Sequence, residues 1–573
     1  MLRIHQDRET RSRHINANQH SFLFARRHMK THDFLAHHGV GCNPFSEEDA
    51  QTDPVFKDHC IESTFHPTWD KIYGNPREPS TAVVLGEKGS GKTAMRLQIA
   101  RQLDLYNDSH PDRRAFVIHY DDFNPFLDRF RERLAPRRRS RADKVLAEWK
   151  LWDHMDAILS LGVTQLVDEI IHSQQDNSPR QTAPPSPAGN ANVESPEGRE
   201  EPIDGAAPTA NSNDPVGESS HTGGGRVALD RHQSRDLLLL AACYDQSIAE
   251  TFTGRWERLR KCLKFSTWTA HLDFVIGAAV TLAATGLGIT LLVRLSTEVL
   301  SSYWLWIVGG WLLLATGCWL PRFWRSLRRH SLAAGVVRRV RVGNRETGLL
   351  RHVLMQFTDS EISEQPLPNR DRTDDRYEML LKLQGVLKSF GYDGVIVLVD
   401  RVDEPHLING SAELMRDLLW PMLDNKFLKH PGLGVKMMLP IELSRFIDRE
   451  ERDFYQRARL DKQNMIRAFE WTGESLFDIA NARLQACVET DAQPTIEVLF
   501  DDGVTNSRLL EAFRSLRVPR RLFKFLYRLL VNHCNAHTDD APVYKISPHL
   551  FESTLAIELR DQDAFDRGVG AGG

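Results

Sequence analysis

The chain has 573 residues, of which 41% are hydrophobic and 26% are charged, so it is long enough for roughly two to four domains with apolar cores. Its formal net charge is −4 at pH 7, whereas a dedicated nucleic-acid-binding protein would carry a strongly basic face, so nucleic acid is not an expected partner. The seven cysteines are scattered without a C-x-x-C pair, which favours reduced cytosolic thiols over a disulfide framework or a zinc site.

The N-terminal region, residues 1 to 40, is polar and carries seven histidines. Their irregular spacing favours a disordered arm over a metal site. The region contains no apolar stretch of the kind found in a cleavable signal peptide. The following segment, from Asn43 to Trp69, is expected to lead into the first strand and cap it.

Residues 86 to 93 match every fixed position of the P-loop pattern G-x-x-x-x-G-K-[ST]. The apolar run Thr81–Leu85 predicts a strand before them, and the apolar spacing in Ala94–Leu105 predicts a helix after them. The glycines allow backbone N–H groups to surround phosphate oxygens at a helix N-terminus. Lys92 is expected to reach the β- and γ-phosphates of ATP, and the Thr93 hydroxyl to bind Mg²⁺. The predicted nucleotide-binding residues are Gly86, Glu87, Lys88, Gly89, Ser90, Gly91, Lys92 and Thr93.

Downstream of the P-loop, a segment of low-complexity composition separates two stretches in which regular secondary structure is predicted. Ala115–Tyr120 predicts a second strand, and Ala142–Ser173 predicts an amphipathic helix. Residues 174 to 230 are dominated by Pro, Ser, Gly, Asn, Ala and Glu, which cannot bury enough apolar surface to offset conformational entropy. That segment is therefore predicted to be a disordered linker, with helix resuming over Ser234–Lys264.

Two uncharged stretches predict a transmembrane hairpin. Phe274–Val293 and Tyr303–Leu320 are each about long enough to cross a ~30 Å hydrocarbon core as a helix, and the short loop Arg294–Ser302 joins them. Because basic residues flank both outer ends, the positive-inside rule places those ends in the cytoplasm. The flanking basic residues are Lys261, Lys264, Arg322, Arg325, Arg328 and Arg329. This predicts a two-pass cell-membrane protein with both termini cytoplasmic; the alternative is a pair of helices buried in a soluble core.

A second nucleotide motif follows the hairpin. The apolar, β-branched run Gly394–Val399 predicts a strand covered on both faces, and it ends in the sequence D-R-V-D-E. Asp400 is expected to hold Mg²⁺ through water, and Asp403 or Glu404 to orient or deprotonate the attacking water. The alternative is a strand-end turn in which an aspartate caps the next helix, predicted over Ser411–Leu423.

The remaining predicted elements supply weaker candidates. Gly434–Leu439 predicts a strand, and Glu442 beyond its end is a candidate γ-phosphate sensor. Arg457 and Arg459 are candidate phosphate contacts. The helix predicted over Arg520–Asn532 opens with arginines that are expected to approach the nucleotide from a C-terminal lid.

Taken together, these motifs resemble the KAP family of P-loop NTPases, which sits beside the STAND and AAA+-like ATPases. The resemblance rests on the P-loop, the hairpin placed before the strand Gly394–Asp400, and the late helix Pro519–Tyr527. The family's second motif usually reads D-D-x-D. Here Arg401 replaces its second aspartate and Glu404 follows Asp403, which is closer to NACHT-type STAND proteins.

The resemblance implies a three-layer α/β P-loop core, interrupted by a two-helix transmembrane hairpin and followed by a C-terminal helical lid. The NTPase domain would lie in the cytoplasm on the membrane, and some bacterial members of the family are linked to phage exclusion. The expected divisions are an arm (1–40), the first core part (41–173), a linker (174–230), juxtamembrane helices with the hairpin (231–345), the second core part (346–450) and a lid with a tail (451–573).

Three functions are consistent with the sequence. The leading one is a membrane-tethered ATPase that uses Mg²⁺-ATP as a switch to assemble a protein partner or copies of itself, in bacterial defence or signalling. The second is a nucleotide-binding membrane scaffold with little hydrolysis. The third is a soluble AAA+-like ATPase acting on DNA, in which the two apolar stretches do not form a transmembrane hairpin.

Overall fold

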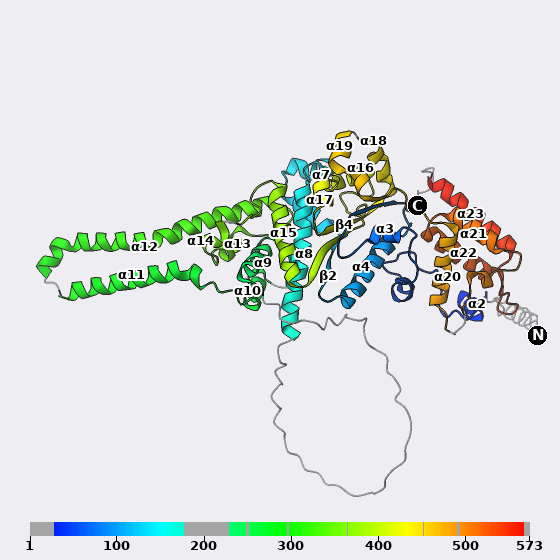
Figure 1. The fold of residues 1–573 in the computed structure, drawn as a ribbon, viewed down its shortest axis with the longest axis horizontal. Coiled ribbons are helices and arrows are strands. Elements are labelled where there is room, and N and C mark those ends of the chain that lie inside the picture. The colour runs from blue at the N-terminus through cyan, green and yellow to red at the C-terminus, as the bar shows by residue number, and fades with distance from the viewer. Residues whose placement is uncertain are drawn as a thin grey trace, which may run out of the picture.

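The computed structural model describes residues 28–176, 229–247, 251–294, 297–363, 365–450, 452–489 and 493–566. The protein is a mixed α/β structure in which a five-stranded parallel sheet is surrounded by helices (Figure 1). Almost all of the predicted linker, and the first 27 residues of the predicted arm, lie outside the described residues.

All pairings in the sheet are parallel, and its strand order is β2-β3-β4-β1-β5. The strands are β1 (Ala82–Gly86), β2 (Arg114–Tyr120), β3 (Tyr392–Val399), β4 (Leu433–Pro440) and β5 (Asn464–Ile466). Every residue of β1 and of β4 is buried, as expected for strands covered on both faces. Because β3, β4 and β1 are adjacent and parallel, the segments that follow these three strands lie at the same edge of the sheet.

Two apolar cores cover the two faces of the sheet. Val83 and Leu85 of β1 pack in a core with α8 (Leu151–Asp176) and α15 (Thr373–Ser389). Ala82 and Val84, which point the other way, pack against α4 (Lys92–Ser109), the helix that follows the P-loop. Helices therefore cover both faces of the parallel sheet, which confirms the expected α/β class.

Two helices predicted as continuous are interrupted. The first is α7 (Ala142–Ala147) followed by α8, and the second is α9 (Arg231–Tyr244) followed by α10 (Phe252–Cys262). In the first break, the Asp153 carboxylate accepts a hydrogen bond from the Lys150 N–H and so satisfies an N-terminal donor of α8. A buried side chain therefore stabilises the start of α8, which apolar periodicity does not reveal.

Helices α11 (Trp268–Arg294) and α12 (Thr297–Arg339) lie side by side and project from one end of the molecule (Figure 1). Among the described residues, one helix is long and apolar enough to cross a membrane, Trp268–Thr290, and only 6% of its apolar window is buried. The predicted second span, Tyr303–Leu320, lies within α12, but several of its side chains are outside the described part. The described residues thus supply one candidate span rather than the two predicted.

A separate apolar core lies at the other end of the molecule. It joins α2 (Thr31–His37) to four C-terminal helices: α20 (Gly473–Ala486), α21 (Asn506–Leu516), α22 (Pro519–Ala536) and α23 (Pro548–Asp566). The prediction of disorder is therefore wrong for residues 28 to 40, because Phe34 and Leu35 are buried in this core. The predicted start of the lid at residue 451 is also too early, since β5 belongs to the sheet.

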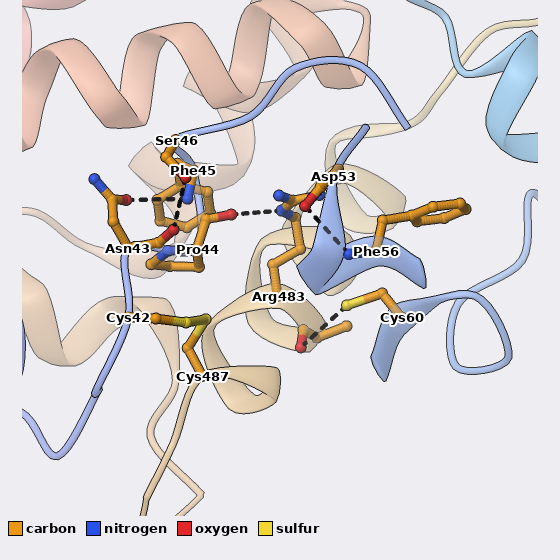
Figure 2. The surroundings of a disulfide bond; sticks show 11 residues. Cys42, Asn43, Pro44, Phe45, Ser46, Asp53, Phe56, Cys60, Arg483 and Cys487 are labelled. Carbon is orange, nitrogen blue, oxygen red and sulfur yellow. Dashed lines mark hydrogen bonds and ion pairs between the residues drawn. A yellow bond between two sulfur atoms is a disulfide. The ribbon is translucent and has the colours of Figure 1, made fainter. Parts of the chain in front are cut away.

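A disulfide joins Cys42 to Cys487, at the C-terminal end of α20 (Figure 2). Beside it, the buried Arg483 guanidinium pairs with Asp53 at 2.5 Å and donates to the Pro44 carbonyl at 2.6 Å. The prediction of reduced thiols is therefore wrong for this pair. The two cysteines are 445 residues apart, and only tertiary folding brings them together.

The buried Lys436 in the middle of β4 makes stability depend on pH. Its ammonium is 1% exposed and donates to the Tyr73 carbonyl at 3.0 Å, and burial lowers the pKa of Lys436 from 10.5 to about 8. We expect Lys436→Met to raise the free energy of unfolding at pH 7 by up to about 3 kcal/mol. Between pH 8 and 10.5 the unfolded wild type binds more protons than the folded one, so its stability rises with pH and the advantage of the variant shrinks.

Thermal unfolding of both proteins from pH 7 to pH 10.5 measures this difference. An advantage of the variant that stays constant over that range would contradict the assignment of a depressed pKa to Lys436.

Candidate nucleotide-binding site

The P-loop connects the end of β1 to the start of α4, as its pattern predicts. Gly89 and Gly91 have φ values of 84° and 93°, in the left-handed region where side chains other than glycine are strained. A Cβ on Gly89 would also lie 2.6 Å from the Cβ of Arg520. The loop conformation therefore requires these two glycines and directs the chain into the N-terminus of α4.

Lys92, the first residue of α4, lies among acidic groups. Its ammonium donates to the carbonyls of Gly86 and Glu87, both at 2.8 Å. Burial lowers the pKa of Lys92, while the carboxylates of Asp400, Asp403 and Glu442 oppose that effect. The positive charge that the motif places here is thus held between the loop carbonyls and the acidic segments after β3 and β4.

The two predicted Mg²⁺ ligands, Thr93 and Asp400, line the same cavity. Asp400 is only 2% exposed and lies directly after β3. Burial raises the pKa of Asp400, and the Arg96 guanidinium and the Thr93 hydrogen bond act in the opposite direction. A hydroxyl and a carboxylate supply the hard oxygen atoms that Mg²⁺ prefers.

The two candidate catalytic acids follow Asp400 in a turn that begins with Arg401 at φ 58°. Asp403 is partly buried, and its carbonyl accepts a hydrogen bond from the Gly410 N–H at 3.0 Å. Glu404 is exposed, and its carboxylate lies 3.2 Å from Arg401 Nε. Partial burial and the nearby carboxylates of Asp403 and Asp400 raise the pKa of Glu404, and Arg401 opposes them. Both acids line the same cavity, so the choice between them stays open.

This cavity has a volume of about 370 Å³, within the usual range for small-molecule sites. Most of the predicted site residues line it: Lys88, Gly89, Gly91, Lys92, Thr93, Asp400, Asp403 and Glu404. The other three residues of the loop do not line the cavity, but their backbone carbonyls accept hydrogen bonds that hold the loop. Gly86 and Glu87 accept hydrogen bonds from Lys92, and the Ser90 carbonyl accepts one from Trp471 Nε1 at 2.7 Å.

Among the weaker candidates, Glu442 and Arg520 also line the cavity, and the Arg520 N–H donates to the Gly89 carbonyl at 3.3 Å. Arg457 instead lines a different hollow, together with Arg449 and Phe454. The late arginine helix therefore approaches the P-loop as predicted, whereas Arg457 does not.

Sequence reasoning missed several residues that complete the site. Arg96 on α4 pairs with Asp400, and Trp471 binds the loop backbone. Asp49 and Asp53, from the segment before β1, line the cavity. No motif marks these positions, but the four-residue spacing from Lys92 to Arg96 places both on one side of α4 and was a usable signal.

Within the described residues, no group of three or more His, Cys, Asp or Glu side chains could hold a metal ion. Mg²⁺ at phosphate-binding sites is typically held by one or two protein groups together with substrate phosphates, so a larger cluster is not required.

Comparisons with known proteins return nothing: no family model, curated protein or solved structure matches the chain. The resemblance to the KAP family stays a prediction that rests on the motifs alone.

Proposed function

We propose that the protein is a membrane-tethered ATPase that binds Mg²⁺-ATP and acts as a nucleotide-dependent switch or assembly factor, in the manner of KAP-like NTPases. The observation that carries this proposal is that Thr93 of the P-loop and Asp400 at the end of β3 line one cavity. Two motifs whose residues lie 307 positions apart in the sequence therefore meet at one edge of a parallel sheet.

The residues present fit ATP and Mg²⁺. The glycine conformations bring the loop backbone to the cavity wall, where a phosphate could approach N–H groups. Lys92 supplies a positive charge, and Thr93 with Asp400 supplies oxygen ligands. Aromatic rings of Phe469 and Trp471 also line the cavity and offer apolar surface for a nucleoside. This combination of groups supports a nucleoside triphosphate as the ligand.

Each residue would then have a defined task. Lys92 would hold the terminal phosphates, and Thr93 and Asp400 would hold Mg²⁺, which would supply positive charge to offset the negative charge of the phosphates. Asp403 or Glu404 orients the attacking water and accepts its proton. The exposed position of Glu404 and its raised pKa suit a group that exchanges protons with solvent.

Substitutions at the three acids separate binding from hydrolysis. Asp400→Asn should weaken Mg²⁺-dependent ATP binding, whereas Glu404→Gln should retain binding and slow hydrolysis by about 100-fold or more. Affinity for a fluorescent ATP analogue and release of radiolabelled phosphate measure the two effects. If Asp403→Asn alone traps ATP while Glu404→Gln turns over normally, the acid is Asp403. Binding without turnover in the wild type would instead indicate a nucleotide-binding scaffold.

The hairpin supports the membrane tether. Exposed apolar side chains on α11 include Ile276 at 57%, Leu282 at 73% and Leu287 at 64%. A soluble core helix would bury such side chains, so α11 has the surface of a helix in lipid. On the inner side of α11, Gly277 faces the Trp319 ring of α12, and the Trp319 indole N–H donates to the Thr281 hydroxyl at 3.1 Å.

The proposed topology places the loop between α11 and α12 outside the cytoplasm and both termini inside. A reporter active only outside the cytoplasm should be active when fused within Ser296–Ser302 and silent at Arg226 or Gly573. The Cys42–Cys487 disulfide argues for the opposite topology, because disulfides are rare in the cytoplasm. The reverse reporter pattern would place the P-loop away from cellular ATP and overturn the proposal.

A further inference from the structure

Arg96 forms ion pairs with two aspartates, and the proposed function gives Arg96 no role. Its side chain is 4% exposed and lies on α4, one helical turn after Lys92. Its Nε donates to Asp400 Oδ2 at 3.2 Å, and its Nη1 lies 2.6 Å from Asp121 Oδ2. Asp121 directly follows β2 and Asp400 directly follows β3, which are neighbouring strands. One guanidinium therefore links the ends of two strands to the P-loop helix.

The position of this guanidinium matters for the site. One oxygen of the Asp400 carboxylate accepts a hydrogen bond from Arg96 Nε, while Asp121 engages Nη1 of the same guanidinium. Because the donors of arginine lie in a fixed plane, holding Nη1 fixes the direction in which Nε meets Asp400, which a lysine ammonium would not do. Asp121 in turn holds Arg96 from the far side.

We infer that Arg96 is a positioning residue for Asp400, held in place by Asp121, and that this pair sets the affinity of the site for Mg²⁺. The inference rests on the proposed function and adds to it the residues that orient the metal ligand. Groups that orient a metal ligand from behind commonly change metal affinity by about 10- to 100-fold when they are removed. Arg96 does not line the cavity, so its effect on nucleotide contacts is indirect.

The test measures how much Mg²⁺ strengthens nucleotide binding. The affinity of full-length protein in detergent for a fluorescent ATP analogue is determined in Mg²⁺ and in EDTA. For Arg96→Gln we expect EDTA affinity close to the wild type and a loss of about tenfold or more in the Mg²⁺-dependent gain. Asp121→Asn should lose part of that gain, and Arg96→Lys should restore part of what Arg96→Gln loses.

Arg101→Gln is the matched control, since Arg101 lies on the same helix in an exposed ion pair with Glu62 at 2.6 Å. Equal Mg²⁺-dependent gains in Arg96→Gln and Arg101→Gln would overturn the inference, as would equal losses in Mg²⁺ and in EDTA. If Arg96→Gln does not fold, Asp121→Asn and Arg96→Lys decide by the same comparison of affinity in Mg²⁺ with affinity in EDTA. If Mg²⁺ does not strengthen nucleotide binding by the wild type, the proposed function itself is wrong.

Discussion

Replacing Asp156 with alanine is expected to lower the free energy of unfolding by about 3–5 kcal/mol. Asp156 on α8 and Arg376 on α15 are both 0% exposed, and two nitrogens of the guanidinium bond to the two carboxylate oxygens at 3.1 Å. The Tyr244 hydroxyl of α9 donates to the same carboxylate at 2.8 Å. Without Asp156, the guanidinium charge and this hydroxyl would both lose a buried partner, because three helices meet at this carboxylate.

Chemical denaturation followed by circular dichroism measures the loss. Asp168→Ala is a matched control on α8, because Asp168 is 42% exposed and its partner Arg255 keeps a second carboxylate, Asp245, at 2.8 Å. The control should cost about 1 kcal/mol or less. Equal losses in the two variants would contradict the account of the buried pair.

Replacing Lys92 with alanine is expected to weaken Mg²⁺-ATP binding by about 100-fold or more, because it removes the charge-assisted hydrogen bonds to the terminal phosphates. Equilibrium binding of a fluorescent ATP analogue measures the change. The fold should survive, since within the described part of the chain the Lys92 ammonium donates only to the carbonyls of Gly86 and Glu87.

Glu87→Ala serves as the control for this substitution. Glu87 belongs to the same loop, but the motif uses only its backbone, and its side chain does not line the cavity. We expect its affinity to stay within about threefold of the wild type. If Lys92→Ala binds the analogue as tightly as Glu87→Ala does, Lys92 does not contact the phosphates.

The elements predicted most closely are those with strong local patterns. The apolar runs before the P-loop and before Asp400 correspond to β1 and β3 within two residues, because buried parallel strands are continuously apolar. The short strand β5, with the sequence N-M-I, has neither length nor pattern, so its place in the sheet follows only from pairing with β1. Helix α2 was missed for a related reason, since two buried side chains in a polar arm do not make a periodic stretch.

In the candidate site, too, residues within local motifs could be predicted and their partners from other segments could not. The motifs predict which residues of the loop and of the segment after β3 belong together, because each motif is local and its chemistry requires the other. The partners from other segments could not be predicted: Asp121 after β2, Trp471 at the loop backbone and the disulfide at Cys42. Those contacts depend on which strands are neighbours and on how the C-terminal helices pack.

We propose that Thr93 and Asp400, which line the same cavity, belong to one Mg²⁺-ATP site. Calorimetric titration of ATP into the purified full-length protein in detergent, with Mg²⁺ and then with EDTA, tests it most directly. We expect saturable binding of about one nucleotide per chain that is stronger in Mg²⁺. No saturable binding in either condition, by protein that retains its helical circular dichroism spectrum, would contradict it.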